Sequence, residues 1–168
     1  MKKHAWLVAI IALGGAASAE ASPRMISSSG DWGVYSYQRD GKSVCYALSV
    51  PKKAEPSNVD HGKNYFLIAP AEGADREEPE VIAGYPLKAG SMIEVSVGPS
   101  WFRMFTKDNT GWVNDPSRAP EFMKALRAGS TMVLRAVSAR GTHTTYTYSL
   151  GGISAALDRI SHCKKQGA

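Results

Sequence analysis

Short runs of strand-forming residues, each followed by turn-forming residues, recur along most of this chain. The clearest run covers residues 92–97, where Ile93, Val95 and Val97 alternate with polar residues. Such alternation places apolar side chains on one face of a strand and polar side chains on the other. Runs of this kind, spaced by roughly 8–12 residues, are typical of an antiparallel sandwich or barrel. Helices do not alternate with the strands, so we do not expect a parallel doubly wound sheet.

The same pattern predicts further strands and one hairpin. Asp40-Gly41 separates two strand-like runs, and Asp-Gly in that position is a strong signal for a tight hairpin turn. Strands are predicted at residues 32–37, 44–50, 65–69, 81–83, 101–106, 112–113, 131–138 and 143–149. The polar stretches 51–63 and 70–79 are interpreted as surface loops, because they contain proline, glycine and charged residues.

Two segments in the C-terminal part have helical periodicity. In residues 120–128, Pro120 suits a first turn and Gly129 can serve as the C′ residue after the helix. In residues 149–163, apolar residues recur at helical spacing. The predicted fold class is therefore mostly β, an antiparallel sandwich or barrel-like domain with a short helix near residues 120–128 and a C-terminal helix.

Residues 1–19 have the order of a secretory signal peptide. Lys2 and Lys3 precede an apolar run, and Ala17-Ser18-Ala19 supplies the small residues of a cleavage site. The run is shorter than the roughly 20 apolar residues that cross a bilayer. We therefore expect cleavage, an exported protein in the periplasm or secreted, and no transmembrane span after cleavage. An uncleaved anchor is the alternative.

The chain left after cleavage has the length of one domain, which is roughly 100–200 residues. Residues 20–30 are small and polar and are interpreted as a flexible lead-in. Residues 31–168 are interpreted as a single β-rich domain.

The charge balance gives no indication of a nucleic-acid partner. The 20 Lys and Arg residues exceed the 15 Asp and Glu residues, but the basic residues are spread along the chain in runs no longer than a pair. A nucleic-acid site needs a clustered basic patch with interleaved aromatic residues. Nucleic acid is therefore not expected to bind.

Cys45 and Cys163 are the only two cysteines. Disulfides persist outside the cytosol, and two cysteines allow one pairing. We expect a bridge that ties an early strand to the C-terminal helix. A reactive thiol is the alternative, although neither cysteine belongs to a Cys-x-x-Cys motif.

Common catalytic motifs are absent from the sequence. It contains no Gly-x-Ser-x-Gly elbow, no Gly-x-x-x-x-Gly-Lys-[Ser/Thr] loop and no His-Glu-x-x-His motif. Three histidines lie beyond the signal peptide: His61, His143 and His162. His61 beside Asp60 could bind a metal ion, His143 could act as a general base, and His162 could pair with Cys163 as a nucleophile. Each is more simply explained as an ordinary loop, strand or helix residue. We expect no enzyme, no metal and no cofactor.

Two further features could bind ions. Free N–H groups at Gly151-Gly152 could bind an anion at the start of a helix. The acidic cluster of Glu77, Glu78 and Glu80 could hold calcium, but it lacks the spacing of an EF-hand loop. An ordinary helix start and a solvated loop are the simpler interpretations.

Aromatic residues in or beside the predicted strands are the best candidates for binding. Most are expected in the core, where Trp and Phe bury large areas. Trp101 or Trp112, each flanked by turns, is the one most expected at the surface. Arg103 shares a strand face with Trp101 and Phe105, and Trp and Arg are enriched in binding hot spots. The candidate binding residues are Trp101, Arg103, Phe105 and Trp112.

A distinctive segment leads into the predicted C-terminal helix: residues 147–158 read Thr-Tyr-Ser-Leu-Gly-Gly-Ile-Ser-Ala-Ala-Leu-Asp. Together with the signal peptide, Gly30-Asp31-Trp32 and the two cysteines, it resembles the invasion-associated locus B family of small exported bacterial proteins. That family usually carries an acid near Tyr146 and Phe in place of Ile153, and this sequence departs from it at both positions.

The resemblance implies an exported, β-rich protein linked to host-cell invasion or envelope function, and it brings no catalytic residues. The distinctive segment also has a purely structural explanation. Ser149 can cap the helix, Leu150 and Leu157 can pack against the core, and Cys163 can anchor the helix end.

We therefore expect a non-enzymatic exported protein that acts as a binding module, with another protein or an envelope component as its partner. A periplasmic protein that binds a small molecule or an anion is the alternative, and it would need a concave pocket of a few hundred Å³. A small enzyme of unrecognised type, using His143 or His61, is a further alternative.

Overall fold

The molecule is built on one antiparallel sheet with two helices at one end. The computed structural model describes residues 22–71 and 76–166. The strands are β1 (Arg24–Ser29), β2 (Trp32–Arg39), β3 (Lys42–Ser49), β4 (Lys53–Glu55), β5 (Tyr65–Pro70), β6 (Glu77–Ile82), β7 (Met92–Val97), β8 (Ser100–Lys107), β9 (Thr110–Val113), β10 (Thr131–Val137) and β11 (His143–Ser149). The helices are η1 (Pro116–Arg118), α1 (Ala119–Ala128) and α2 (Ile153–Gln166).

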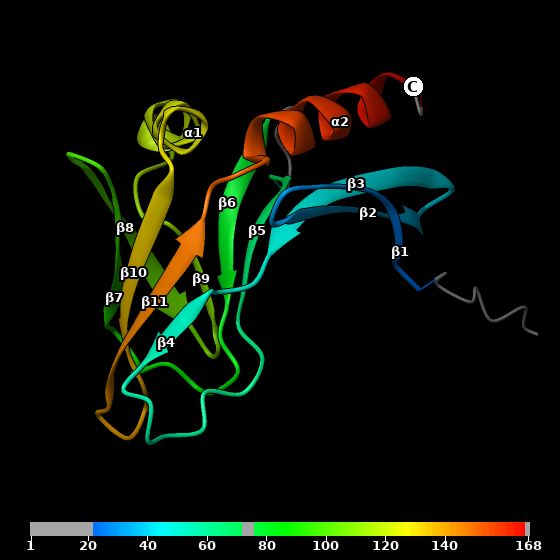
Figure 1. Cartoon of the computed structure of the whole chain (residues 1–168). Helices are drawn as coiled ribbons and strands as arrows, with labels where there is room; N and C mark the ends of the chain where they lie inside the picture. The colour runs from blue at the N-terminus through cyan, green and yellow to red at the C-terminus, as the bar shows by residue number, and fades with distance from the viewer. Residues whose placement is uncertain (1–21, 72–75, 167–168) are drawn as a thin grey trace, which may run out of the picture.

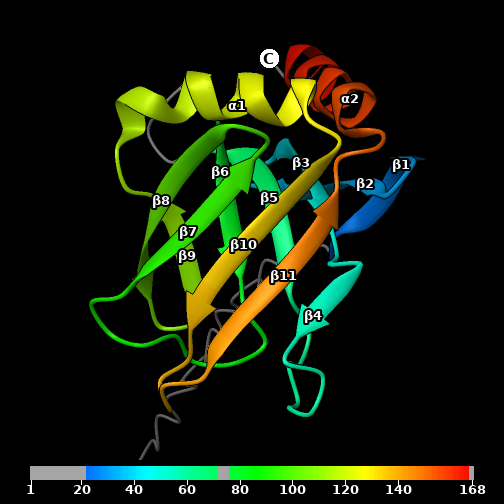
Figure 2. The ribbon, with the colours of Figure 1, turned by 60° about the vertical axis from the view of Figure 1, so that its left-hand side comes forward.

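The strands are hydrogen-bonded in the order β1-β2-β3-β5-β6-β9-β8-β7-β10-β11-β4. This sheet bends around its core without closing, so that its parts face one another as in a sandwich (Figure 1). Helices α1 and α2 lie at the same end of the sheet in both ribbon views (Figure 2). The predicted fold class, mostly β with a short helix and a C-terminal helix, is confirmed.

The Asp-Gly hairpin is formed as predicted. Strands β2 and β3 pair from Gly33 opposite Leu48 to Arg39 opposite Lys42. The turn residues Asp40 and Gly41 have φ values of 52° and 73°. A two-residue turn with both φ angles positive matches the twist of the strands that it joins.

Three polar segments form strands that the sequence pattern did not predict. Most of the lead-in expected at residues 20–30 is β1, which pairs with β2; residues 20 and 21 lie outside the described residues. Strand β4 falls in the loop expected at residues 51–63 and pairs with β11. Strand β6 begins inside the loop expected at residues 70–79 and pairs with β5. Pairing with a neighbour stabilises these segments, although their sequences lack an alternating apolar pattern.

Aromatic side chains form the centre of the core beneath α1. Phe122 of α1 stacks on Phe102 of β8, with ring centroids 4.1 Å apart. Phe66 of β5 meets Phe122 edge to face and lies 5.9 Å from the ring of Tyr148. All four side chains are buried. Helix α1 is thereby held against strands that are distant from it in sequence.

Gly129 follows α1 in an extended conformation, with φ −84° and ψ 164°, whereas a glycine after a helix commonly takes a left-handed one. A Cβ at this position would lie 2.5 Å from Val97 Cγ1 and 2.9 Å from Leu150 Cδ1. Glycine is therefore needed here because of close packing, whereas backbone conformation does not require it.

Helix α2 is fastened to the sheet by its apolar face and by the expected disulfide. Ile153, Leu157 and Ile160 are buried, and Cys163 is bonded to Cys45 of β3 across 118 residues of sequence. The disulfide prediction is confirmed. The helix begins at Ile153, and not at Ser149 as predicted.

Residues 149–152 form a turn that packs against the β1–β2 turn. The Ser149 hydroxyl accepts a hydrogen bond from the Gly151 N–H at 3.1 Å, so it caps this turn and not the helix. The Gly151 carbonyl accepts a hydrogen bond from the Asp31 N–H at 3.0 Å. A side chain at Gly152 would overlap the Ser29 carbonyl. The Gly151 N–H, one of the two proposed for an anion, is therefore already used within this turn.

The predicted signal peptide lies outside the described residues. Among the residues that are described, no helix is both long enough and apolar enough to cross a membrane.

Candidate binding surface

The outward face of β8 carries three of the four predicted binding residues. Phe102 and Met104 point into the core, so Trp101, Arg103 and Phe105 point outward. Trp101 is 55% exposed and Phe105 is 43% exposed. Large apolar side chains exposed next to one another indicate an interaction surface more often than isolated ones do.

Neighbouring residues complete this surface. The Arg103 guanidinium carbon lies 5.3 Å from the centre of the Trp101 ring. Phe105 stacks on Trp112 of β9, with ring centroids 5.5 Å apart. Trp112 is half-buried because Phe105 covers it, so Trp101 is the exposed tryptophan of the two. The structure thus brings all four candidate residues together.

Arg118 of η1 is a fifth member that the sequence pattern did not single out. Its guanidinium carbon lies 5.9 Å from the centre of the Trp101 ring and 4.8 Å from that of Phe102. A cation above an aromatic face is attracted by the ring quadrupole. We call Trp101, Arg103, Phe105, Trp112 and Arg118 the aromatic–arginine patch.

Local hydrogen bonds hold Arg118 in place. Its Nε and one terminal nitrogen each donate to a Glu121 carboxylate oxygen at 3.0 Å. This pairing lowers the pKa of Glu121. Asp115 caps η1 by accepting hydrogen bonds from the Ser117 hydroxyl and N–H, which lower the pKa of Asp115. The three-residue spacing of Arg118 and Glu121 could have identified this pair from the sequence.

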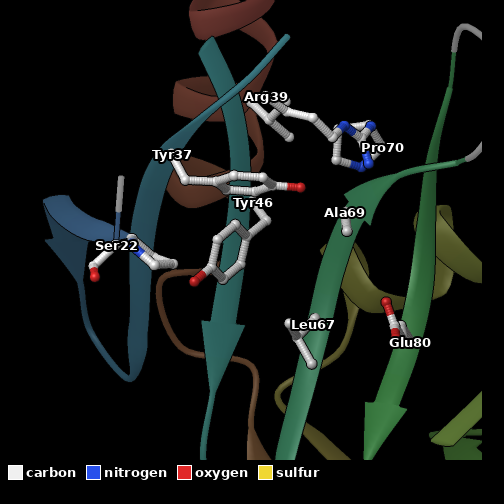
Figure 3. A pocket seen from close by; sticks show the side chains of 10 residues that line it. Ser22, Tyr37, Arg39, Tyr46, Leu67, Ala69, Pro70 and Glu80 are labelled. Atoms are coloured by element: carbon white, nitrogen blue, oxygen red, sulfur yellow. The ribbon is translucent and has the colours of Figure 1, made fainter. Parts of the chain in front are cut away.

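The same outward face of the sheet is hollowed beside the patch. One hollow of about 570 Å³ is lined by residues of β2, β3, β5 and β6, including Tyr37, Tyr46 and Glu80 (Figure 3). A second hollow of about 510 Å³ includes Phe105, Trp112 and again Glu80. The outward face is therefore continuous from Tyr37 to the aromatic–arginine patch, with Glu80 in the middle.

Glu80 is a half-buried carboxyl on this face. Burial is the main cause that raises its pKa, and the neighbouring carboxylate of Glu78 raises it further. Glu78 has a distant ion pair with Arg76, at 3.9 Å. The described residues contain no group of three or more His, Cys, Asp or Glu side chains placed to hold a metal ion.

His61 belongs to a chain of hydrogen bonds at another part of the sheet. Its Nδ1 lies 2.8 Å from the Tyr146 hydroxyl, and its Nε2 lies 2.9 Å from the Pro56 carbonyl oxygen. The Tyr146 hydroxyl contacts that of Tyr85 at 3.0 Å, which in turn contacts the Thr144 hydroxyl at 2.6 Å. Both ring nitrogens of His61 are thus occupied: Nδ1 fastens the loop to β11, and Nε2 contacts Pro56 within the same loop.

The other two histidines stand apart from any cluster. His143 is exposed at the start of β11. His162 is exposed on α2, where its Nδ1 lies 2.6 Å from the Asp158 carbonyl oxygen. Its neighbour Cys163 is in the disulfide, so the two cannot form a nucleophilic pair.

These features define a class: a mostly antiparallel β protein whose C-terminal helix is bonded to an early strand, with aromatic and charged residues gathered on one outward sheet face. The sequence matches the family described as Invasion associated locus B (IalB) protein over residues 32–161. The chain belongs to this family, and the resemblance noted in the sequence is confirmed.

One solved structure similar to this chain is that of invasion associated protein B from Bartonella henselae. The two share 17% sequence identity, and the match covers 88% of this chain and 100% of that chain with a TM-score of 0.64. At this identity the likeness shows the fold alone. No curated protein matches the chain significantly.

Proposed function

We propose that this protein is a non-enzymatic, exported binding module whose aromatic–arginine patch contacts another protein in the envelope or outside the cell. The observation that carries the proposal is the gathering of exposed Trp101 with Arg103 and Arg118 on one face. Trp and Arg residues dominate the energy of many protein interfaces.

The chemistry of the patch favours a protein partner that carries carboxylates beside apolar side chains. Trp101 and Phe105 offer apolar area that water solvates poorly. Arg103 makes no ion pair with a described residue, so its guanidinium can bind a carboxylate of the partner through two hydrogen bonds. Arg118 is already paired with Glu121 and mainly positions the Trp101 ring.

Export and a link to host-cell invasion remain part of the proposal. Export is supported by the order of residues 1–19, which is that of a signal peptide. The link to invasion is supported by the description of the family to which the chain belongs.

The test is crosslinking in cells that express the tagged full chain, followed by mass spectrometry. The Trp101→Ala/Arg103→Ala variant should lose the crosslinked protein that the unchanged chain captures. The matched control is Arg24→Ala/Met25→Ala, which also removes an exposed arginine and an exposed apolar side chain, but on β1. If both variants capture the same protein as the unchanged chain, the patch is not the interface.

A further inference from the structure

Two tyrosines form one wall of the hollow at β2 and β3. The ring centroids of Tyr37 and Tyr46 are 6.2 Å apart, with the ring planes inclined at 64°. Tyr35 also stacks on Tyr46, with ring centroids 5.5 Å apart. This contact fixes the Tyr46 ring, so the wall is formed before any ligand arrives. We call the hollow lined by Tyr37, Arg39, Tyr46, Leu67 and Glu80 the tyrosine groove (Figure 3).

Leu67 provides apolar lining between the tyrosines and Glu80 in the tyrosine groove. In β5, Phe66 and Ile68 point into the core, so the side chain of Leu67 points to the outward face. It is nevertheless only 8% exposed. An apolar side chain so well covered on the outward face of a sheet provides a floor against which an apolar ligand can pack.

The charges of the tyrosine groove lack partners. The Glu80 carboxylate makes no hydrogen bond or ion pair with a described residue, although it is half-buried. Arg39, which lines the same hollow, also makes no ion pair within the described part of the chain. A half-buried carboxylate without a counter-ion is unfavourable, and a cationic ligand would remove that cost.

We propose that the tyrosine groove binds a small organic molecule that carries a primary ammonium group on an apolar or aromatic body. The ammonium group pairs with Glu80, and the body lies over Leu67 against the rings of Tyr37 and Tyr46. Aromatic faces attract both apolar groups and cations. The tyrosine groove adjoins the aromatic–arginine patch, because Glu80 also lines the second hollow with Trp112. Ligand binding in the groove does not depend on the function proposed for the patch.

Arg39 provides a binding position for a second charged group of the ligand, a carboxylate. A ligand that also carries a carboxylate can place it near the Arg39 guanidinium, which binds carboxylates well. The shared chemistry is the ammonium group, which a free amine, an amino acid or the N-terminus of a short peptide can supply. Phenethylamine, phenylalanine and the dipeptide Phe-Ala represent these three sources, and 3-phenylpropionate has the same body without the ammonium group.

The experiment is calorimetric titration of each probe into the full-length, oxidised protein at neutral pH. At least one of the three amines should bind with a dissociation constant of about 1 mM or tighter, whereas 3-phenylpropionate, which can pair only with Arg39, should bind at least about tenfold more weakly. The probe that binds best identifies the source of the ammonium group. If none of the amines binds, or if 3-phenylpropionate binds as well as they do, the proposal is overturned.

Variants test the role of the carboxylate. Glu80→Gln keeps the shape of the side chain and should weaken binding of the best amine by about tenfold or more. Glu94→Gln is the matched control, because Glu94 is exposed on β7 and does not line the tyrosine groove; it should leave binding unchanged. Equal affinity for the Glu80→Gln protein and the unchanged protein would overturn the proposal. A second variant, Tyr37→Leu, removes one aromatic ring from the wall of the tyrosine groove. It should also weaken binding of the best amine.

The pH dependence gives an independent readout. Burial and Glu78 raise the pKa of Glu80, so this carboxyl becomes protonated at a higher pH than an ordinary glutamate as the solution is acidified, and the charge that the ammonium group needs is removed. Affinity for the amine should therefore fall as the pH is lowered. In the Glu80→Gln protein the remaining affinity should not change over the same range, and a parallel fall in both proteins would contradict the assignment.

Discussion

The negative charge of Glu80 lowers the stability of the folded protein, but the proposed ligand binding requires this charge. Its pKa in the folded protein is raised above the ordinary value, first by burial and then by Glu78. The folded state therefore disfavours the ionised carboxyl, and this penalty is present at pH values above the folded pKa. It disappears once the pH is low enough to protonate the group in both the folded and the unfolded state.

We predict that Glu80→Gln raises the free energy of unfolding at neutral pH. The gain should be less than about 1 kcal/mol, because the group is half-buried and water screens its charge. The gain should vanish in acid, where the carboxyl of the unchanged protein is protonated. Urea unfolding at neutral and acidic pH measures both values. A Glu80→Gln protein that is less stable at neutral pH would contradict the burial argument.

Gly129 offers a second test at a single residue. Gly129→Ala should lower the free energy of unfolding by about 1–3 kcal/mol, the range for overpacking in a well-packed core. The reason is the approach of the added Cβ to Val97 and Leu150. Ser130→Ala is the control, because that neighbouring side chain is exposed, and its effect should be small. Thermal unfolding measures the loss of stability in both variants. Equal losses would mean that Val97 and Leu150 move aside for the added Cβ at little cost.

Helices, strands and loops are held to one another by a few specific contacts. The loop that contains His61 reaches β11 through the Tyr146 hydroxyl, which also contacts that of Tyr85. Tyr146 is almost fully buried, and burial raises the pKa of its hydroxyl. The hydroxyl thus stays protonated and works as a hydrogen-bonding link at all physiological pH values.

Tyr146→Phe removes this link and keeps the ring. We expect a loss of about 1–3 kcal/mol in the free energy of unfolding, because partners of the hydroxyl are left without hydrogen bonds. Amide hydrogen exchange should accelerate in the loop around His61 and stay unchanged in α1. The control is Tyr65→Phe, because Tyr65 is only half-buried on the outward side of β5. Unchanged exchange in the loop would show that backbone contacts hold it without the hydroxyl.

The disulfide acts on the whole molecule, because it joins residues that are 118 positions apart. In the chain-entropy account, a bridge that closes so long a loop restricts the unfolded chain strongly. We predict that Cys45→Ser/Cys163→Ser lowers the free energy of unfolding by about 2–5 kcal/mol. Denaturant unfolding of the variant and of the oxidised protein measures the difference. A loss below about 1 kcal/mol would indicate that packing alone holds α2 on the sheet.

Local patterns were enough to predict most of the strands, both helices and the disulfide. The alternation at residues 101–106 also placed Trp101, Arg103 and Phe105 on one strand face, as the structure has them. These predictions succeeded because the period of a strand, the turn preference of Asp-Gly and the pairing of two cysteines depend on neighbouring residues or on simple counting.

Strands and surfaces that form only when distant segments of the chain pair could not be predicted from the sequence. Strands β1 and β4 are polar, and only their partners β2 and β11 turn them into strands. The order of the sheet decides that Glu80 of β6 lies between the two tyrosines and the aromatic–arginine patch. Sequence alone therefore determined most of the elements and which aromatic and charged side chains they carry. Tertiary structure decided which of them share a surface, because burial and charge at a site arise from segments that meet only when the chain is folded.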